Sequence, residues 1–158
     1  MAESCTPAVD GEPCRLPFVE KRFDLKRGIP MSCGHVVLAD SHSNMLEGMR
    51  GMIETLAKSV IMVADEPSLI QAIHRMQPDL VIADLSFQVS GADNVVQLIK
   101  LHHPAMKVIV VSIYDDPTVV DEATLAGAEG FVLKRRAVVD LLPAIHEVRQ
   151  GGLYVSVT

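Results

Sequence analysis

The chain has 158 residues, 49% of them apolar and 22% charged, which suits one domain with a sizeable core. The net charge is −6 and lies within residues 35–158, because residues 1–34 carry five basic and five acidic side chains. An acidic domain is a poor candidate for binding nucleic acid directly. No apolar run approaches the roughly 20 residues that span a bilayer and no signal peptide is evident, so we expect a cytoplasmic protein without membrane contact.

Residues 1–34 are predicted to be a mobile N-terminal tail. Four of the nine prolines fall within residues 1–33, and no hydrophobic periodicity is sustained there. The three cysteines Cys5, Cys14 and Cys33 lie in the same stretch. Their odd number and the absence of a paired short spacing argue against both a disulfide framework and a zinc site.

From residue 35, short apolar runs alternate with amphipathic segments. The apolar runs occupy residues 35–39, 60–64, 80–83, 107–112 and 130–133. Runs that are apolar throughout are typical of strands buried on both faces of a parallel sheet. The run over 80–83 is bounded by Pro78 and ends at Asp84, which places this carboxylate at the carboxyl end of a central strand.

Five helices are predicted between and after these strands. The first is capped by Ser43 or Asn44, the second opens at Asp65-Glu66-Pro67, the third carries Val95, Leu98, Ile99 and His102, and the fourth runs from Asp116-Pro117 to about Gly127. The last is marked by Val138, Leu141, Leu142, Ile145 and Val148 and ends at Gly151-Gly152, with Pro143 near its first turn or at a kink.

This alternation predicts an α/β fold with a parallel sheet covered on both faces by helices. Right-handed crossovers leave few topologies for five such units. We therefore expect a flavodoxin-like, doubly wound (βα)5 three-layer sandwich with strand order 2-1-3-4-5. The folded domain is expected to cover residues 35–152, and residues 153–158 to begin a C-terminal linker or tail.

Polar side chains stand at the carboxyl ends of four of these strands. They are Asp40, Asp84, Ser112 and Lys134. Ligands of open α/β sheets bind at this edge. Two neighbouring carboxylates repel one another unless a cation lies between them, and Mg²⁺ prefers such oxygen ligands. A carboxylate beside Mg²⁺ can accept a phosphoryl group, with a lysine and a hydroxyl stabilising the transferred oxygens.

On these residues the chain resembles the receiver domains of two-component response regulators, the CheY-like superfamily. The resemblance rests on Val36–Asp40, Pro78–Leu85, Val110–Ser112 and Gly127–Lys134. It covers residues 35 to about 152. Gly130–Lys134, the basic residues after it and the closing Gly151–Ser156 are most similar to receivers of the NarL/FixJ type, in which a linker and a helix-turn-helix DNA-binding domain usually follow.

The resemblance implies a role for each matching residue. Asp84 matches the phosphoryl acceptor, and Lys134 the lysine that pairs with it. Asp40 matches the first acid of the metal pair, and Ser86 would offer its backbone carbonyl to Mg²⁺. The switch pair is matched by Ser112, the hydroxyl, and Phe131, the aromatic that rotates inward.

Two positions depart from the pattern of the family. Ser41 stands where a second acid is normally a direct metal ligand, which predicts weaker Mg²⁺ binding and slower phosphorylation. Gln88 stands where the loop after the acceptor usually carries a proline. Both departures keep an alternative open, in which the domain is a phosphorylation-independent module for dimerisation or partner binding, with Met45, Met49 and Met52 as a possible contact.

As a phosphorylated receiver, the chain would take its phosphoryl group from a sensor histidine kinase. It would then change a protein surface, commonly a homodimer interface, at which Phe131, Val120 and Leu125 are candidates if exposed. DNA would be bound only by a separate C-terminal domain.

The chain is expected not to be an enzyme, because a haloacid-dehalogenase-type phosphatase needs an Asp where Ser86 stands. A flavin-binding flavodoxin is not expected either, because it needs a phosphate loop after the first strand and the sequence has none there. All six histidines are predicted to be surface or packing residues.

Overall fold

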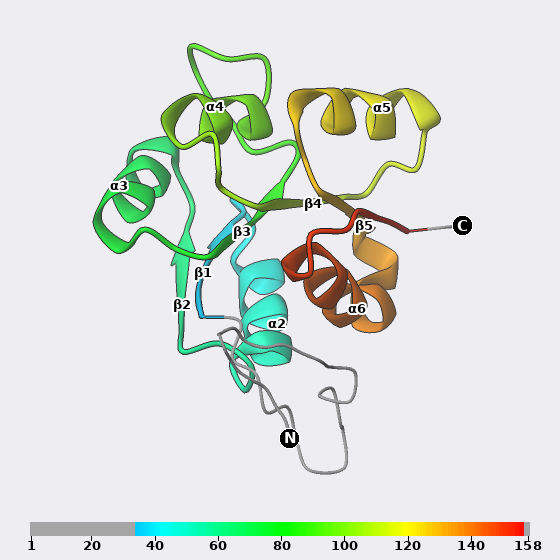
Figure 1. Ribbon diagram of the computed structural model, residues 1–158, viewed down its shortest axis with the longest axis horizontal. Helices are drawn as coiled ribbons and strands as arrows, with labels where there is room; N and C mark the ends of the chain where they lie inside the picture. The colour runs from blue at the N-terminus through cyan, green and yellow to red at the C-terminus, as the bar shows by residue number, and fades with distance from the viewer. Residues whose placement is uncertain (1–33, 157–158) are drawn as a thin grey trace, which may run out of the picture. The chain divides into compact units, whose positions relative to one another are not determined.

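A computed structural model describes residues 34–156 of the chain. Residues 1–33, which hold the three cysteines and nearly all of the expected tail, lie outside the described residues, as do residues 157 and 158. The elements, shown in Figure 1, are β1 (His35–Ala39), α2 (Ser43–Ile53), β2 (Ser59–Val63), α3 (Glu66–Met76), β3 (Leu80–Asp84), α4 (Val95–His102), β4 (Val108–Ser112), α5 (Pro117–Ala126), β5 (Gly130–Leu133), the 3-10 turn η2 (Lys134–Arg136), α6 (Ala137–Arg149) and β6 (Tyr154–Val155).

The strands form one parallel sheet with the order β2-β1-β3-β4-β5-β6. The predicted order 2-1-3-4-5 is confirmed, and a sixth strand is added beside β5. In the added pair, Gly130 lies opposite Tyr154 and Phe131 opposite Val155. The sixth strand falls in the stretch that the sequence assigns to the start of a linker or tail.

Helices cover both faces of the sheet, as the doubly wound fold requires (Figure 1). On one face α3, α4 and α5 pack over a core that includes Val37, Val81 and Val110. On the other face α2 and α6 pack over a core that includes Leu38, Ile82 and Ile109. Successive strand residues point to opposite faces, so an uninterrupted apolar strand supplies both cores at once.

Side-chain caps start two of the helices as predicted. The Asp65 carboxylate accepts a hydrogen bond from the Ser68 backbone N–H at 2.9 Å, and the Asp116 carboxylate accepts one from the Thr118 N–H at 2.8 Å. The expected cap of the first helix is wrong. His42 holds the cap position of α2, and its side chain makes no capping hydrogen bond.

The last predicted helix is present as α6, and the apolar residues that mark it are only partly buried. Leu141 is fully buried in α6, but Val138 is 83% and Leu142 38% exposed. Ala137 and Leu141 face the sheet, and the next residue along a helix points about 100° away. Pro143 lies in the interior of α6.

Between residues 34 and 156, the structure has no helix with the length and apolar character that crossing a bilayer requires.

Candidate functional site

The ends of four parallel strands bring the candidate residues to one edge of the sheet. Asp40 directly follows β1, Asp84 is the last residue of β3, Ser112 is the last residue of β4, and Lys134 directly follows β5. The ladder pairs Asp84 with Val111, the residue before Ser112. The strands that carry these groups are neighbours, which explains why residues nearly 100 positions apart can meet.

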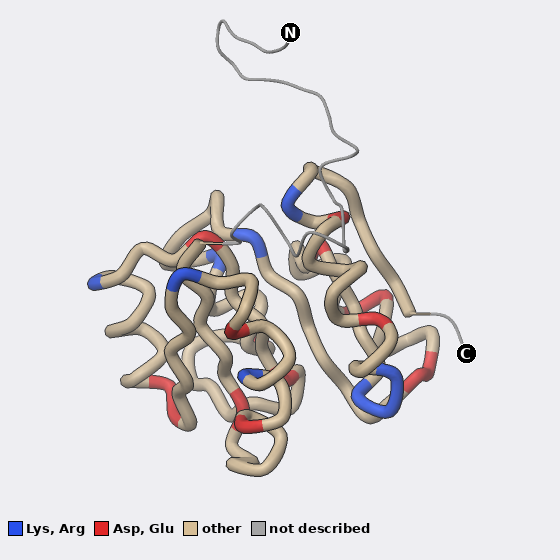
Figure 2. Tube along the Cα trace, turned by 90° about the horizontal axis from the view of Figure 1, so that it is seen from below, with Lys and Arg blue, Asp and Glu red and all other residues tan. Residues whose placement is uncertain are grey.

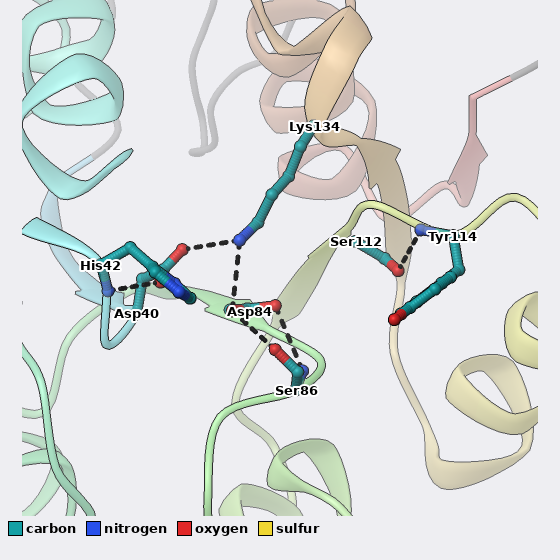
Figure 3. A network of polar contacts seen from close by, with 7 residues as sticks. All are labelled: Asp40, His42, Asp84, Ser86, Ser112, Tyr114 and Lys134. Carbon is teal, nitrogen blue, oxygen red and sulfur yellow. Dashed lines mark hydrogen bonds and ion pairs between the residues drawn. The ribbon is translucent and has the colours of Figure 1, made fainter. Parts of the chain in front are cut away.

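Lys134 joins the two buried carboxylates. Its Nζ lies 3.0 Å from Asp40 Oδ2 and 3.2 Å from Asp84 Oδ2, as the dashed lines in Figure 3 show. Asp40 is completely buried, Asp84 is 2% exposed, and the lysine side chain is 13% exposed. Two carboxylates share one ammonium group, so these three residues keep a net charge of −1. Burial makes this excess charge expensive unless a further cation compensates it.

Asp40 is also held by His42. Its Oδ1 accepts the His42 backbone N–H at 2.8 Å and lies 3.0 Å from the Nδ1 of the same histidine. Burial raises the pKa of Asp40, but the hydrogen bonds from His42 and Lys134 outweigh it, so the pKa lies below its usual value. His42 is exposed, as predicted for a surface histidine, and its ring also contacts the buried Asp40 carboxylate.

Asp84 faces an open cleft and is oriented by the residue two positions on. The Ser86 N–H donates to Asp84 Oδ1 at 3.1 Å, and the Ser86 hydroxyl donates to Oδ2 at 2.9 Å. The cleft measures about 680 Å³, and its lining includes Asp84, Ser86, Ser112 and Lys134. A carboxylate that is fixed by its neighbours and still borders open volume can meet an incoming ligand.

The two residues of the expected switch pair lie in different surroundings. Ser112 is 2% exposed, lines the cleft, and accepts the Tyr114 backbone N–H at 3.0 Å through its hydroxyl. Phe131 is 1% exposed in the core and does not line the cleft. Phe131 is therefore not a surface residue in this conformation, whereas Leu125, another candidate for the contact surface, is 88% exposed.

Three side chains at this edge can hold a cation together. Ligand atoms of Asp40, His42 and Asp84 all lie within 4.8 Å of one another. Ser41, which stands between the first two in sequence, is exposed. Two buried carboxylates suit Mg²⁺, and an imidazole nitrogen is a ligand that Mg²⁺ uses less readily than transition metals do. Sequence reasoning missed His42, although its position two residues after a strand-end aspartate is visible in the sequence.

Comparison with known proteins agrees with this geometry. The family described as "Response regulator receiver domain" matches residues 36–146. The transcriptional regulatory protein DegU of Brevibacillus brevis is 28% identical over 123 residues, which cover 76% of this chain and 52% of DegU. The transcriptional regulatory protein RcsB of Escherichia coli K12 is 27% identical over 122 residues, or 74% of this chain and 56% of RcsB. The chain thus spans about half the length of these relatives.

A solved structure shares the fold. The non-phosphorylated receiver domain of the stress response regulator RcsB from Escherichia coli superposes with a TM-score of 0.71 and 26% identity. The match covers 78% of this chain and 98% of the RcsB receiver domain. The likeness therefore spans that domain almost completely, including the strand ends that carry the site.

Proposed function

Because the chain belongs to the response regulator receiver domain family, we propose that it accepts a phosphoryl group on Asp84 from a sensor histidine kinase. The observation that carries the proposal is the shared lysine. Lys134 contacts both buried carboxylates, and one of these, Asp84, borders the open cleft. If the two buried carboxylates only stabilised the fold, we would expect one cation for each of them and no open volume beside them.

In the proposed reaction, an Asp84 carboxylate oxygen attacks the phosphorus of the donor. The new bond joins that oxygen to phosphorus, and the bond between phosphorus and the kinase imidazole breaks, so that the imidazole leaves. The ammonium of Lys134 pairs with the oxygens of the transferred group. The Ser112 hydroxyl, which lines the same cleft, is proposed to donate a hydrogen bond to one of them.

The residues at the edge fit a divalent cation. Asp40, Asp84 and the Ser86 backbone carbonyl are the proposed ligands of Mg²⁺, with the Ser41 hydroxyl or water where the family has a second acid. The net charge of −1 on Asp40, Asp84 and Lys134 supports this assignment. Bound Mg²⁺ would neutralise the carboxylates and the incoming phosphoryl oxygens. A ring nitrogen of His42 is proposed as an additional ligand.

Phosphorylation is proposed to act on a surface used for homodimerisation. Ser112 would move toward the phosphoryl group, and Phe131 would repack as the hydroxyl leaves its place. Relatives such as DegU and RcsB are transcriptional regulatory proteins. We therefore propose that this domain controls transcription in the cytoplasm, through a DNA-binding domain that is not within residues 34–156.

Ser41 supports a second candidate function. A site without its second acid binds Mg²⁺ less tightly, and a receiver that is never phosphorylated would act as a constitutive module for dimerisation or partner binding. The two candidates differ in one measurable property, the ability of Asp84 to take up a phosphoryl group.

Intact-mass spectrometry after incubation with acetyl phosphate and Mg²⁺ tests the proposal. We expect one added phosphoryl group on the wild-type chain and none on Asp84→Asn. Asp93→Asn is the matched control, because Asp93 is an exposed carboxylate that lines the same cleft. No adduct on a folded wild-type protein, with Mg²⁺ or with Mn²⁺, would favour the phosphorylation-independent module.

A further inference from the structure

A second buried polar cluster contacts the Lys134–Arg136 turn, in addition to the cluster of Asp40 and Asp84. This turn is the blue turn of consecutive basic residues in Figure 2. The centre of the second cluster is Asp140 of α6, which is 3% exposed. Arg136 donates to both carboxylate oxygens, from Nε at 2.8 Å and from Nη2 at 3.2 Å. The Ser156 hydroxyl donates to Asp140 Oδ2 at 2.6 Å. Asp140 thus ties the C-terminal end of the described chain to the start of α6.

Ser156 also completes the hydrogen bonding of β5. Its hydroxyl accepts the Leu133 N–H at 3.1 Å, and its own N–H donates to the Phe131 carbonyl at 2.8 Å. The strand β6 ends at Val155, so the Ser156 side chain takes over where the strand pairing stops. Leu133 and Ser156 are both nearly buried, and their hydrogen bond is therefore costly to break.

These contacts hold the residues on both sides of Lys134. Leu133, just before it, is bound to Ser156, and Arg136, two residues after it, is bound to Asp140. The turn that carries Lys134 is therefore held at its start through the backbone of Leu133 and at its end through the side chain of Arg136. The Lys134 side chain reaches away from the turn to Asp40 and Asp84 (Figure 3). The position of the ammonium group depends on a turn that the C-terminal segment helps to hold.

We infer that Asp140 and Ser156 are positioning residues for Lys134, and that occupation of Asp84 is coupled through them to the docking of residues 154–156 on β5. This coupling rests on the proposed function, because it needs a phosphoryl group or its mimic at Asp84. The two states are a docked segment, as observed, and an undocked one. A group on Asp84 that binds Lys134 favours the turn geometry of the docked state, so it stabilises docking.

Coupling of this kind is reciprocal. If a ligand at Asp84 strengthens docking by some factor, then docking strengthens binding of that ligand by the same factor, so a variant that undocks the segment binds the ligand more weakly. Beryllofluoride, a mimic of the phosphoryl group, is a suitable probe because it binds a carboxylate without a phosphodonor. Removal of the Ser156 hydroxyl is expected to lower beryllofluoride affinity by about three- to tenfold, the range in which residues outside a binding site tune coupling.

Hydrogen exchange of the full chain with and without beryllofluoride and Mg²⁺ tests the inference. In the wild type, we expect slower exchange in peptides that contain Asp84 and also in peptides over residues 152–158. In Ser156→Ala, residues 152–158 should lose this response, and the affinity should fall as stated. Ser156→Thr keeps a hydroxyl and should restore both. Ser59→Ala is the matched control. Ser59 lies on β2, the edge strand opposite β6, and its Oγ lies 2.7 Å from His35 Nδ1.

The readouts separate the possible failures. Slower exchange around Asp84 with unchanged or faster exchange over 152–158 would overturn the coupling and leave the proposed function intact. Wild-type beryllofluoride affinity in a folded Ser156→Ala would overturn the positioning role, because a purely structural bond would change stability alone. Exchange unchanged even around Asp84 would overturn the proposed function and the coupling with it. If Ser156→Ala does not fold, the wild-type comparison decides.

Discussion

Asp84 and Asp140 are both buried aspartates with a basic partner and a serine hydroxyl, and they serve different purposes. Asp84 shares Lys134 with Asp40 and borders a cleft of about 680 Å³. Asp140 has Arg136 to itself and does not line that cleft. Asp40, Asp84 and Lys134 carry a formal net charge of −1 beside open volume, whereas the formal charges of Asp140 and Arg136 sum to zero.

The difference indicates what distinguishes the carboxylate that we propose to be reactive from one that holds elements together. Burial and a basic partner are common to both, so neither property identifies a site by itself. Asp84 shares its lysine with Asp40 and borders open volume in which a ligand can bind. Asp140 has its hydrogen bonds filled by Arg136 and Ser156, which leaves it suited to holding elements together.

The largest effect is expected when the ammonium group that Asp40 and Asp84 share is removed. Lys134→Ala leaves two buried carboxylates without their common partner and the phosphoryl oxygens without an ammonium group. We expect phosphoryl uptake from acetyl phosphate to slow by about 100-fold or more, as when a charge-stabilising group is lost from an active site. The intact-mass time course measures this rate.

Arg135→Ala is the control for that variant. Arg135 belongs to the same turn but pairs with the exposed Asp115 at 2.7 Å. Its removal should leave the rate of phosphoryl uptake near that of the wild type. Equal slowing in both variants would show that the turn as a whole matters and that Lys134 has no special part.

The structural role of the second cluster is tested by Asp140→Asn. The change keeps the shape of the side chain but removes the charge that pairs with Arg136. We expect the free energy of unfolding to fall by about 1–3 kcal/mol, the usual cost of impairing buried hydrogen bonds. Urea denaturation followed by circular dichroism measures it, with Asp115→Asn as an exposed control that should change it less. A larger loss in the control would contradict the assignment of Asp140 as the structural carboxylate.

Ser41→Asp tests how the charge of the first cluster affects Mg²⁺ binding. A second acid beside Asp40 raises the local negative charge and restores the ligand type that the family pattern has at this position. We expect Mg²⁺ affinity to rise by about tenfold, because the charge of the ligands tunes affinity at oxygen sites. Isothermal titration calorimetry measures the affinity. An unchanged value would mean that Ser41 or His42 already satisfies the cation.

The smallest expected effect is on the free energy of unfolding at acidic pH. The hydrogen bonds from Arg136 hold the pKa of Asp140 below its usual value of 3.8, with further support from Ser156 and Tyr154. A pKa lowered by folding contributes stability above the unfolded value, and this contribution is lost as the pH falls through the folded pKa. The wild type should therefore lose more stability than Asp140→Asn between pH 5 and the acid limit of folding. Parallel curves for the two proteins would contradict the charged pairing.

The sequence predicts the first cluster far better than the second. Asp40, Asp84 and Lys134 each end an apolar run, and the rule that parallel strands share a carboxyl edge brings them together. Asp140 and Ser156 belong to no such pattern. The strand β6 has two residues, too few for periodicity to reveal it, and the hydrogen bonds that dock residues 154–156 join residues at least 16 positions apart in sequence.

Two other residues show where periodicity stops being informative. His42 is largely exposed, as expected for a surface histidine, yet the backbone turn after β1 aims its ring at Asp40. Val138 shares the apolar character of the buried residues of α6 but sits on the outer side of the helix. In both cases tertiary geometry, which residue type alone does not encode, decides the outcome.

Chemical trapping locates the phosphoryl group that we propose Asp84 to carry. After incubation with acetyl phosphate and Mg²⁺, borohydride reduces an aspartyl phosphate to homoserine, which peptide mass spectrometry locates in the sequence. We expect homoserine at position 84 and unmodified aspartate at positions 40, 93 and 140. Homoserine at another of these positions, or aspartate throughout in a folded protein, would contradict the proposed role of Asp84.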